Sequence, residues 1–534
     1  MYKFLKEHKQ QFFLCLIILL TIVTRLIDLG VLPNGFHQDE AFVVLNAYDL
    51  YCEGRDSGGH LWPVYMSSWG DGQSAMYIWL LLPLMWITKG SISLWVVRIP
   101  QMIVSVLSVA AVYGIVKRLG NSSNKGLLAA GMLAICPWHY MMARWGLDAN
   151  MAPGFIIFAL YFFVLGLEKD KYLLLSAFFY ALTLYCYAVT WPIVPFIILC
   201  EIVYGFMAKK LKFNLTLVLS AVILVVTAMP VFLYFLVNQG YIDEINLPFM
   251  SIYRSYHFRS DELTLSVNNI IINLKTFARL LIFNDTGDPW STIKPFGLFY
   301  IPGLIFMVIG AAFWVINLVI KLRKKAQIDA EIILGIQLVG GLLVAAFVRP
   351  RFHQTNIIYI PLVILEAYGI WNTIEIVVKL SRDAGKKVGI VVWSTTILAY
   401  AVMFVLFLAN YFGPYRKLVN AYFCEDAQEC VEYAVGVCEE NDIHMITAEK
   451  GMQWPRLLLF TKTTPGEYYS ENLIYDEEPA PWSYSNGDLT VQTRIDYKNI
   501  TTESVYILYY TDVDIFSEQF SLVAFGDWYV AVPK

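Results

Sequence analysis

The stretch Leu32–Val44 reads LPNGFHQDEAFVV and follows the first long apolar run of the chain. Its Pro-Asn-Gly triplet is typical of a turn. Two adjacent acids, Asp39 and Glu40, come next, and the following AFVVLNAYDLY predicts a helix. The acids have two readings: they cap the helix that begins here, or they serve proton transfer at a membrane surface. The stretch alone leaves both readings open.

The composition of the 534-residue chain excludes a soluble enzyme, because 58% of the residues are hydrophobic and only 15% are charged. The formal net charge of −4 indicates no nucleic-acid partner. The first apolar run follows three lysines, and no small-residue cleavage site follows it. We therefore expect a retained anchor rather than a signal peptide, in an all-α polytopic membrane protein.

Apolar runs of spanning length predict about eleven transmembrane helices. They are expected near residues 12–28, 94–116, 126–142, 152–167, 172–189, 192–207, 215–237, 296–320, 331–348, 357–378 and 388–412. The run Ala75–Thr88 is short and contains Pro83. If this run spans the membrane, the basic links between later helices lie opposite the N-terminal lysines. If it lies in the interface, all of them lie on the cytoplasmic side, and the positive-inside rule favours this arrangement.

This topology puts the N-terminus in the cytoplasm and exposes long loops on the outer face, where loops of such length usually carry function. The outer segments are residues 29–93, 143–151, 238–295 and 349–356. The tail, residues 413–534, also faces out and is more polar. Residues 426–439 predict a helix in this tail, and IHMIT, SVYILYY and WYVAV predict strands.

The chain is therefore predicted to divide into a transmembrane domain, residues 1–412, and an extracytoplasmic α/β domain, residues 413–534. Cys424, Cys430 and Cys438 stand on the outer segment. A disulfide among them stays open, because the sequence cannot choose a partner.

Most ionisable residues gather at the outer ends of helices or in the outer loops, which favours chemistry at the outer water–lipid boundary. Arg349 and Arg351 form the densest basic group together with His353, and guanidinium groups match phosphate oxygens. Headgroup anchoring is the alternative reading. Arg254 and Arg259 form a second basic group, for which a solvated amphipathic loop is the alternative.

Asp148 follows Arg144 by four residues in the second outer segment. A surface ion pair at this spacing would contribute about 0.3–0.5 kcal/mol and needs no functional role. A functional acid at the outer end of a helix is the other reading, and both stay open.

The order of these features resembles the polyprenyl-phosphate-sugar glycosyltransferases with the GT-C fold. The pattern consists of Asp39-Glu40 after the first span, the non-spanning segment Ala75–Thr88, Arg98-Ile-Pro100 opening the second span, and Asp148 after the third. It is most similar to protein O-mannosyltransferases and to the aminoarabinose transferases of lipid A. The resemblance runs through residues 1–412, and some members also carry a soluble C-terminal appendage.

The resemblance implies that a hexosyl or pentosyl group passes from an undecaprenyl- or dolichyl-phosphate donor to an acceptor hydroxyl, with inversion. Asp39 would be the general base, with Glu40 beside it orienting the site. The departing phosphate gains negative charge and needs cations. Those residues would be Arg349, Arg351, Arg254, Arg259 and His353.

The same resemblance assigns sugar or acceptor contacts to Asp148, His37 and Asp71, and lets Arg98 brace the first loop. One departure concerns the stretch Trp69–Ser74, where the aminoarabinose transferases place a lysine and this chain has none. Asp71 in that stretch therefore indicates a different sugar or acceptor contact. A divalent metal near the acids stays open, as does the ligand set that would hold it.

Two other classes stay in view. A lipid-linked-sugar transporter or flippase would explain the spans and the basic groups, but it requires a polar path that the apolar spans do not show. A non-catalytic cell-envelope assembly protein would use the tail to bind other proteins. The sugar, the acceptor (protein, glycan or glycolipid), the oligomeric state and the role of the tail stay open.

Overall fold

The computed structural model describes residues 8–68, 72–255, 258, 266–284, 286–438, 442–448, 450–464, 483–485, 489–493, 500–516 and 518–534. The chain forms two compact units, which we call the helical unit and the mixed unit. The helical unit comprises Met1–Asp28, Ile99–Met229 and Arg259–Tyr415, and the mixed unit comprises Leu29–Arg98, Pro230–Phe258 and Arg416–Lys534. The predicted outer segment 29–93 and the first part of the predicted outer segment 238–295 therefore belong to the same unit as most of the tail. The functional division at residues 412/413 stays a prediction.

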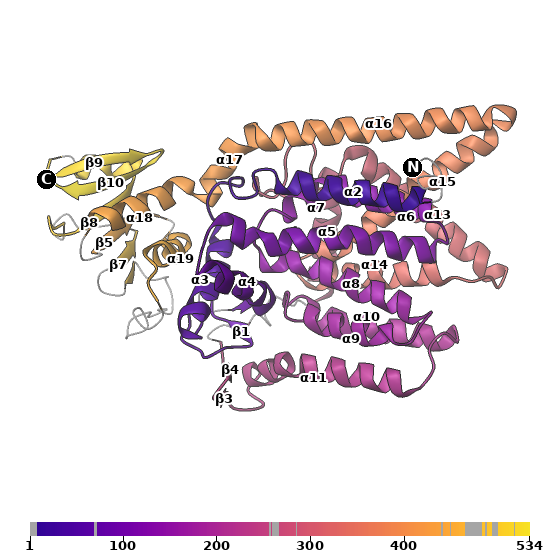
Figure 1. Ribbon diagram of the computed structural model, residues 1–534, viewed down its shortest axis with the longest axis horizontal. Helices are drawn as coiled ribbons and strands as arrows, with labels where there is room; N and C mark the ends of the chain where they lie inside the picture. Colours follow the sequence, from indigo (N-terminus) through magenta and orange to yellow (C-terminus); the bar gives the residue numbers. More distant parts are fainter. Residues whose placement is uncertain are drawn as a thin grey trace. The chain divides into compact units, whose positions relative to one another are not determined.

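The helical unit is a bundle of apolar helices (Figure 1). Its helices are α2 (Lys9–Leu26), most of α5 (Leu94–Leu119), α6 (Ser123–Ile135), α7 (Pro137–Met142), α8 (Met151–Gly166), α9 (Tyr172–Thr183), α10 (Thr190–Met207), the first part of α11 (Leu215–Asn238), α12 (Val267–Phe283), α13 (Ile301–Arg323), α14 (Asp329–Phe347), α15 (Tyr359–Leu380) and α16 (Gly385–Phe412). Helices α13 and α15 pack most closely. A Cβ on Gly310 would lie 2.0 Å from the Leu365 carbonyl oxygen, and one on Gly369 would lie 2.0 Å from that of Phe306. Glycine at both positions allows this close backbone approach, as is typical between membrane helices.

Nine helices in the described part of the chain are long and apolar enough to cross a membrane. The predicted count of about eleven is not confirmed, because two predicted spans are broken. The run at residues 126–142 divides into α6 and α7 at Pro137, which lacks the backbone N–H that a continuous helix would use. The run at residues 172–189 is helical only to Thr183, as α9.

The predicted outer segment 238–295 is also not entirely loop, since it contains α12. Asn273 on α12 donates to the Ala346 carbonyl oxygen at the end of α14, at 3.1 Å. The apolar residues of α12 recur with helical spacing among polar ones, and this amphipathic pattern is the signal for the helix.

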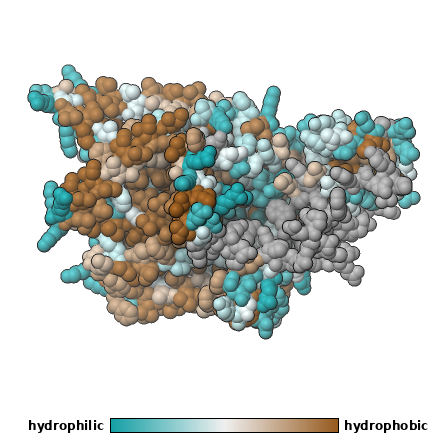
Figure 2. All heavy atoms as spheres, turned by 180° about the vertical axis from the view of Figure 1, so that it is seen from behind, coloured by the Kyte–Doolittle hydropathy of each residue, from teal (hydrophilic) through white to brown (hydrophobic). Residues whose placement is uncertain are grey.

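The surface of the helical unit exposes more apolar side chains than the surface of a water-soluble protein. Helices α11, α13 and α16 are each less than one-fifth buried over their most apolar windows. Figure 2 shows hydrophobic side chains covering this part of the face that it presents. Exposed apolar helix faces of this extent require lipid around them, so the chain is an integral membrane protein.

The mixed unit contains the helices α3 (Gln38–Glu53), α4 (Ala75–Thr88), most of α17 (Pro414–Phe423), α18 (Glu425–Val437) and α19 (Lys450–Thr461). Two short antiparallel pairs, β1 (Tyr65–Met66) with β2 (Gln73–Ser74) and β3 (Ile245–Leu247) with β4 (Met250–Ile252), lie in it as well. Helix α4 packs against α3. At 1.5 Å per residue its 14 residues reach about 21 Å, short of the roughly 30 Å apolar core of a bilayer.

The tail forms a six-stranded sheet in the order β6-β7-β5-β8-β10-β9, with α18 packed against it (Figure 1). The strands are β5 (Ile443–Ile446), β6 (Ser483–Ser485), β7 (Leu489–Gln492), β8 (Val505–Tyr509), β9 (Phe520–Phe525) and β10 (Trp528–Pro533). Strand β5 runs parallel to β7 and β8, and β10 runs antiparallel to β8 and β9. The predicted α/β character is confirmed, including the helix near 426–439 and the three strands. All eight cysteines lie in the described part of the chain and are free.

Candidate functional site

The turn before the acidic pair is held by the tail. Gly35 has φ +85, and a Cβ there would lie 2.4 Å from the Phe423 carbonyl oxygen, so only glycine fits without strain. Gly35 forms an antiparallel bridge with Cys424, and the Asn34 amide donates to a Glu425 carboxylate oxygen at 2.9 Å. The sequence predicts the turn, but its partner lies about 390 residues away and has no signal in the sequence.

The predicted helix after the turn is α3, and His37 is its N-cap. The His37 Nδ1 accepts a hydrogen bond from the Asp39 backbone N–H at 3.3 Å and lies 3.5 Å from the Asp39 Oδ2. Asp39 and Glu40 therefore stand in the first turn rather than at the cap, where the helix dipole favours negative charge. The Asp39 side chain keeps 32% of its surface exposed, whereas that of His37 keeps 8%.

Glu40 has a different environment, because it forms a fully buried ion pair with Arg98. The Arg98 Nε lies 3.0 Å from Oε1 of Glu40, and its Nη2 lies 3.1 Å from Oε2. The remaining guanidinium N–H groups donate to the carbonyl oxygens of Leu29, Pro33 and Gly35. Both side chains are 0% exposed. All five N–H groups of Arg98 are thus used inside the first loop, a geometry that supports the bracing role predicted for this residue.

The tail also packs directly on the residues that precede Asp39. Arg456, which is 2% exposed, donates from Nε to the Phe36 carbonyl oxygen at 2.9 Å. The rings of Phe36 and Phe460 are 5.8 Å apart, and those of His37 and Phe423 are 5.5 Å apart. The backbone that presents Asp39 is therefore fixed by residues that the sequence places in a separate appendage.

Gln73 is a further candidate site residue, which the sequence alone does not single out. It is buried on β2, and its Nε2 donates to the Asp39 backbone carbonyl oxygen at 3.2 Å. Its Oε1 is buried and has no hydrogen-bond partner within the described residues. A buried acceptor left free beside Asp39 is the kind of group that binds a substrate hydroxyl. Its position in the stretch Trp69–Ser74 is the signal that the sequence offers.

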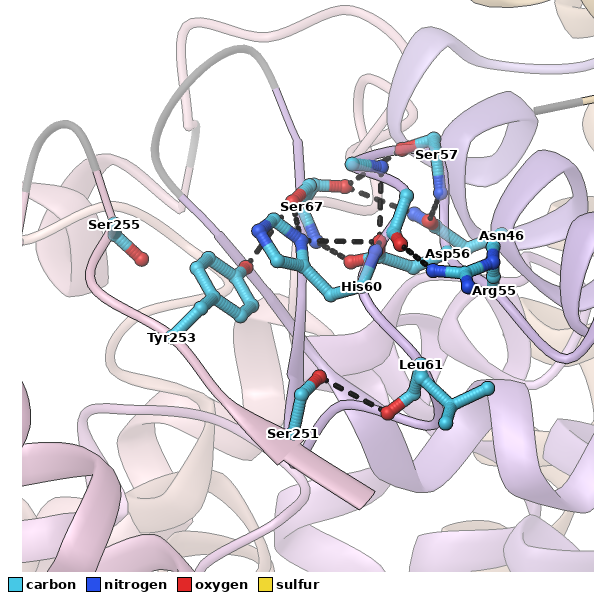
Figure 3. A network of polar contacts seen from close by, with 12 residues as sticks. Asn46, Arg55, Asp56, Ser57, His60, Leu61, Ser67, Ser251, Tyr253 and Ser255 are labelled. Atoms are coloured by element: carbon cyan, nitrogen blue, oxygen red, sulfur yellow. Dashed lines mark hydrogen bonds and ion pairs between the residues drawn. The ribbon is translucent and has the colours of Figure 1, made fainter. Parts of the chain in front are cut away.

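A polar network centred on Asp56 stabilises the loop that follows α3 (Figure 3). The Asp56 carboxylate is 0% exposed. Its Oδ1 accepts from the backbone N–H groups of Gly58 and His60, at 2.9 and 2.8 Å, and its Oδ2 accepts from that of Ser67 at 2.7 Å. The carboxylate thus closes residues 56–67 into a compact loop.

The same network joins this loop to the segment that contains β4 (Figure 3). The His60 ring stacks on Tyr253 with centroids 3.6 Å apart and planes 8° apart, and the Ser67 hydroxyl donates to the Tyr253 hydroxyl at 3.2 Å. Burial raises the pKa of Tyr253, and the nearby Tyr234 and Asp56 raise it further, so Tyr253 stays a neutral phenol.

Asp56, His60 and Ser67 are not a nucleophilic triad. Asp56 Oδ1 and Ser67 Oγ both lie at the same ring nitrogen, Nδ1 of His60, at 3.2 and 3.3 Å. A triad needs the acid and the nucleophile on opposite nitrogens of the imidazole. The cluster therefore has a structural role and excludes a serine-hydrolase reading.

Replacing Asp56 by Ala is expected to destabilise the protein by about 3 kcal/mol, because three partly buried backbone N–H groups lose their charged acceptor. The measurement is the thermal unfolding midpoint of the purified protein in detergent. Asp243→Ala, at an exposed acid of the same unit, is the control and should shift stability by less than about 0.5 kcal/mol. Equal midpoints for Asp56→Ala and the control would show that the network contributes nothing.

The other predicted acid, Asp148, lies in the helical unit. It is 7% exposed and begins the short helix η1 (Asp148–Asn150), where its Oδ1 accepts from the Ala149 backbone N–H at 2.7 Å. Arg144 is fully buried, and its Nε donates to the Tyr411 hydroxyl at 3.0 Å and its Nη1 to the Arg25 carbonyl oxygen at 2.7 Å. A solvent-exposed surface ion pair therefore does not describe Arg144.

The basic group after α14 lies beside the Asp148 segment. The Asn356 amide donates to the Ala149 carbonyl oxygen at 2.9 Å, and the Phe352 and Trp145 rings stack at 5.9 Å. Arg349 and Arg351 are exposed, and His353 is half-buried with its ring 6.3 Å from that of Tyr187. The helical unit thus brings one predicted acid and two exposed guanidinium groups onto adjoining segments.

The other predicted residues fall into two groups. Arg254 is exposed in the mixed unit, where its Nε donates to the Val237 carbonyl oxygen at 3.3 Å. Asp71 and Arg259 lie outside the described residues. Within the described part of the chain, no three His, Cys, Asp or Glu side chains gather in a way that could hold a metal ion. Glu40, one of the two acids near which a metal was considered, is already paired with Arg98.

Comparison with known proteins gives one family and a set of related folds. Residues 73–234 match the dolichyl-phosphate-mannose-protein mannosyltransferase family. No curated protein sequence matches the chain. ArnT from Cupriavidus metallidurans, solved bound to undecaprenyl phosphate, has a TM-score of 0.57 at 11% identity, and the match covers 97% of each chain.

A second group of solved structures is archaeal. The oligosaccharyltransferase of Archaeoglobus fulgidus, tethered to an acceptor peptide, has a TM-score of 0.51 at 12% identity and covers 86% of this chain and 64% of its own. AglB from the same organism, in complex with an inhibitory peptide and a dolichol-phosphate, has a TM-score of 0.50. At such identities the similarity concerns the fold.

Proposed function

The chain is a membrane glycosyltransferase with the GT-C fold, and we propose that it transfers a sugar from a polyprenyl-phosphate donor to an acceptor hydroxyl, with Asp39 as general base. The observation that carries this proposal is the contrast between the two adjacent acids. Glu40 is buried against Arg98, while Asp39 keeps a partly exposed carboxylate beside His37. A base must be accessible to its substrate, and of this pair only the Asp39 carboxylate has exposed surface.

The proposed reaction is one inverting displacement. The acceptor oxygen attacks the anomeric carbon and gives its proton to the Asp39 carboxylate. The bond between that carbon and the phosphate oxygen breaks, and its electron pair leaves with the polyprenyl phosphate. The free Oε1 of Gln73 lies on the residue that binds the Asp39 backbone, where it can accept a hydrogen bond from an acceptor or sugar hydroxyl.

The leaving phosphate requires cations, and Arg349 and Arg351 are the proposed ligands, with His353 beside them. Both guanidinium groups are exposed at the end of α14 and stand where basic residues are otherwise rare on the predicted outer face. Arg254 is the second choice. The matched family acts on dolichyl-phosphate-mannose, and ArnT binds undecaprenyl phosphate, which supports a lipid-linked donor for this chain.

The proposed orientation follows from the basic links between helices. It places the N-terminus in the cytoplasm and Asp39, Asp148 and the tail outside. An outer site suits acceptors of the cell surface, namely a protein hydroxyl, a glycan or a glycolipid.

The direct test is sugar transfer by the purified protein in detergent, supplied with labelled polyprenyl-phosphate mannose and a serine- or threonine-containing acceptor. We expect labelled acceptor, free polyprenyl phosphate and an inverted anomeric configuration by NMR. A pentose donor and a glycolipid acceptor are the next combination. Detergent abolishes transport, so binding of the donor without any cleavage across these combinations would favour the transporter reading instead.

A further inference from the structure

A cavity of about 700 Å³ lies inside the helical unit, and none of the residues assigned above lines it. It is lined at the ends of α5 and α13, at the end of α8 and at the start of α14, by Leu119, Lys321, Leu167 and Asp329 among others. Asp148 precedes the opposite end of α8, and that helix of 16 residues is about 24 Å long. Arg349 likewise follows the far end of α14. The cavity therefore opens at the predicted cytoplasmic ends of these helices.

The charges around the cavity do not cancel. Three of its cations have carboxylate partners: Arg118 with Glu168 at 3.7 Å, Lys210 with Asp329, and Lys321 with Glu331 at 2.6 Å. The fourth is Lys125, whose Nζ lies 5.5 Å from the centre of the Trp371 ring. Within the described residues it has no carboxylate partner. An uncompensated ammonium group at a half-buried position favours an anion.

Two buried polar atoms of the lining also have no protein partner. They are Nε1 of Trp371 and Oε2 of Glu331, each without a hydrogen bond among the residues that the structure describes. Glu331 is 4% exposed, and Trp314 Nε1 fixes its backbone by donating to its carbonyl oxygen at 3.0 Å. Buried groups of this kind call for a partner. The cavity thus offers one donor and one cation close together, and one carboxylate acceptor.

The rest of the lining is apolar. Ile157, Leu160 and Val164 come from α8, with Leu334 from α14 and Ile364 from α15. A water-soluble anion would leave this surface uncovered, whereas an acyl chain would cover it. The matching ligand is therefore an amphiphile with a phosphate and a hydrogen-bond donor in its head group.

We propose that the cavity binds a glycerophospholipid of the adjoining leaflet. Its phosphate accepts hydrogen bonds from Lys125 and from the Trp371 N–H, and the ammonium or hydroxyl of its head group donates to Glu331. An acyl chain lies along the apolar wall. Phosphatidylethanolamine and phosphatidylglycerol satisfy all three contacts, whereas phosphatidylcholine lacks the N–H donor that Glu331 needs.

The test is native mass spectrometry of the full-length protein in detergent, titrated with phosphatidylethanolamine or phosphatidylcholine. We expect phosphatidylethanolamine to bind about tenfold more tightly, from one hydrogen bond to a charged group. Glu331→Gln should reduce that preference. Trp371→Phe and Lys125→Gln should each weaken binding of both lipids by about tenfold. Lys171→Gln is the matched control, because Lys171 lies 5.3 Å from the Tyr172 ring but does not line the cavity.

Equal affinities for the two lipids, unchanged by Glu331→Gln, would overturn the proposal. So would wild-type affinity in Trp371→Phe, a variant that keeps the ring and therefore the packing even where Glu331→Gln fails to fold. Inorganic phosphate at equal concentration should not displace the lipid, and displacement would assign the cavity to a soluble anion instead. Diacylglycerol has acyl chains and a hydroxyl but no phosphate. It should bind the wild-type protein no more tightly than phosphatidylethanolamine binds the Lys125→Gln variant.

Discussion

Asp39→Asn is expected to lower the rate of sugar transfer by about 10²–10⁴-fold, the range typical of losing a positioned base. The amide keeps the size of the carboxylate but cannot take the acceptor proton. The backbone contacts of Asp39, from its N–H to His37 and from Gln73 to its carbonyl oxygen, do not depend on the side-chain charge. The contact of its Oδ2 with the His37 Nδ1, at 3.5 Å, is partly exposed, and such pairs contribute little to stability. We therefore expect a folded protein with a normal unfolding temperature. The measurement is transfer of labelled sugar by purified wild type and variant at matched protein concentration.

The control for this variant is Glu53→Gln, at an exposed acid on the last turn of the same helix α3. It removes the same charge from the opposite end of the helix and should leave transfer within about twofold. Donor binding should survive in Asp39→Asn, because the proposed phosphate ligands are untouched. If a folded Asp39→Asn protein transfers sugar at the wild-type rate, Asp39 is not the base. This conclusion holds whichever donor the protein uses.

Arg98→Ala is expected to destabilise the protein by about 3–5 kcal/mol, the largest stability effect that we anticipate. The substitution leaves the Glu40 carboxylate buried without a cation. It also leaves the carbonyl oxygens of Pro33 and Gly35 without the donors that now lie 2.6 and 2.8 Å away. The thermal unfolding midpoint in detergent measures the loss. Arg98→Lys should recover only part of it, because an ammonium group cannot form the two parallel bonds of the guanidinium fork.

The double variant Glu40→Met with Arg98→Met separates the charge from the packing. Replacing both members of a buried pair by apolar groups is often close to neutral, so the double variant should be more stable than Arg98→Ala. Arg279→Ala, at an exposed arginine whose described contact is the Phe283 ring, is the control and should change stability by less than about 0.5 kcal/mol. If the double variant is less stable than Arg98→Ala, the ion pair between Glu40 and Arg98 itself stabilises the fold.

The structure shows contacts of the tail that the sequence does not indicate. The sequence presents residues 413–534 as a polar appendage whose role stays open. In the structure Arg456, Phe423 and Glu425 contact the residues that precede Asp39. Removing the tail would thus expose the turn and release the backbone of the proposed base. The tail contributes to the site even though none of its residues is assigned a catalytic part.

The sequence by itself determines the membrane character, the GT-C pattern, the helix after the acidic pair and the strands of the tail. Each of these depends on local signals: run length, helical or alternating periodicity, and the order of a few motifs. The count of spans does not follow in the same way, since Pro137 breaks one apolar run and another ends early at Thr183. The first break follows from the missing backbone N–H of Pro137, and after Thr183 the side chains of Thr190 and Trp191 donate to the carbonyl oxygens of Thr183 and Leu184. Run length encodes neither feature.

Only the tertiary structure decides how the acidic pair Asp39-Glu40 is divided. The two residues are neighbours of the same charge in one helical turn, and the sequence treats them alike. Successive residues of a helix point about 100° apart, so one carboxylate turns inward and the other outward. Arg98, 58 positions further on, meets the inward one and neutralises it. Burial and a distant cation make Glu40 structural, and exposure beside His37 makes Asp39 the proposed base.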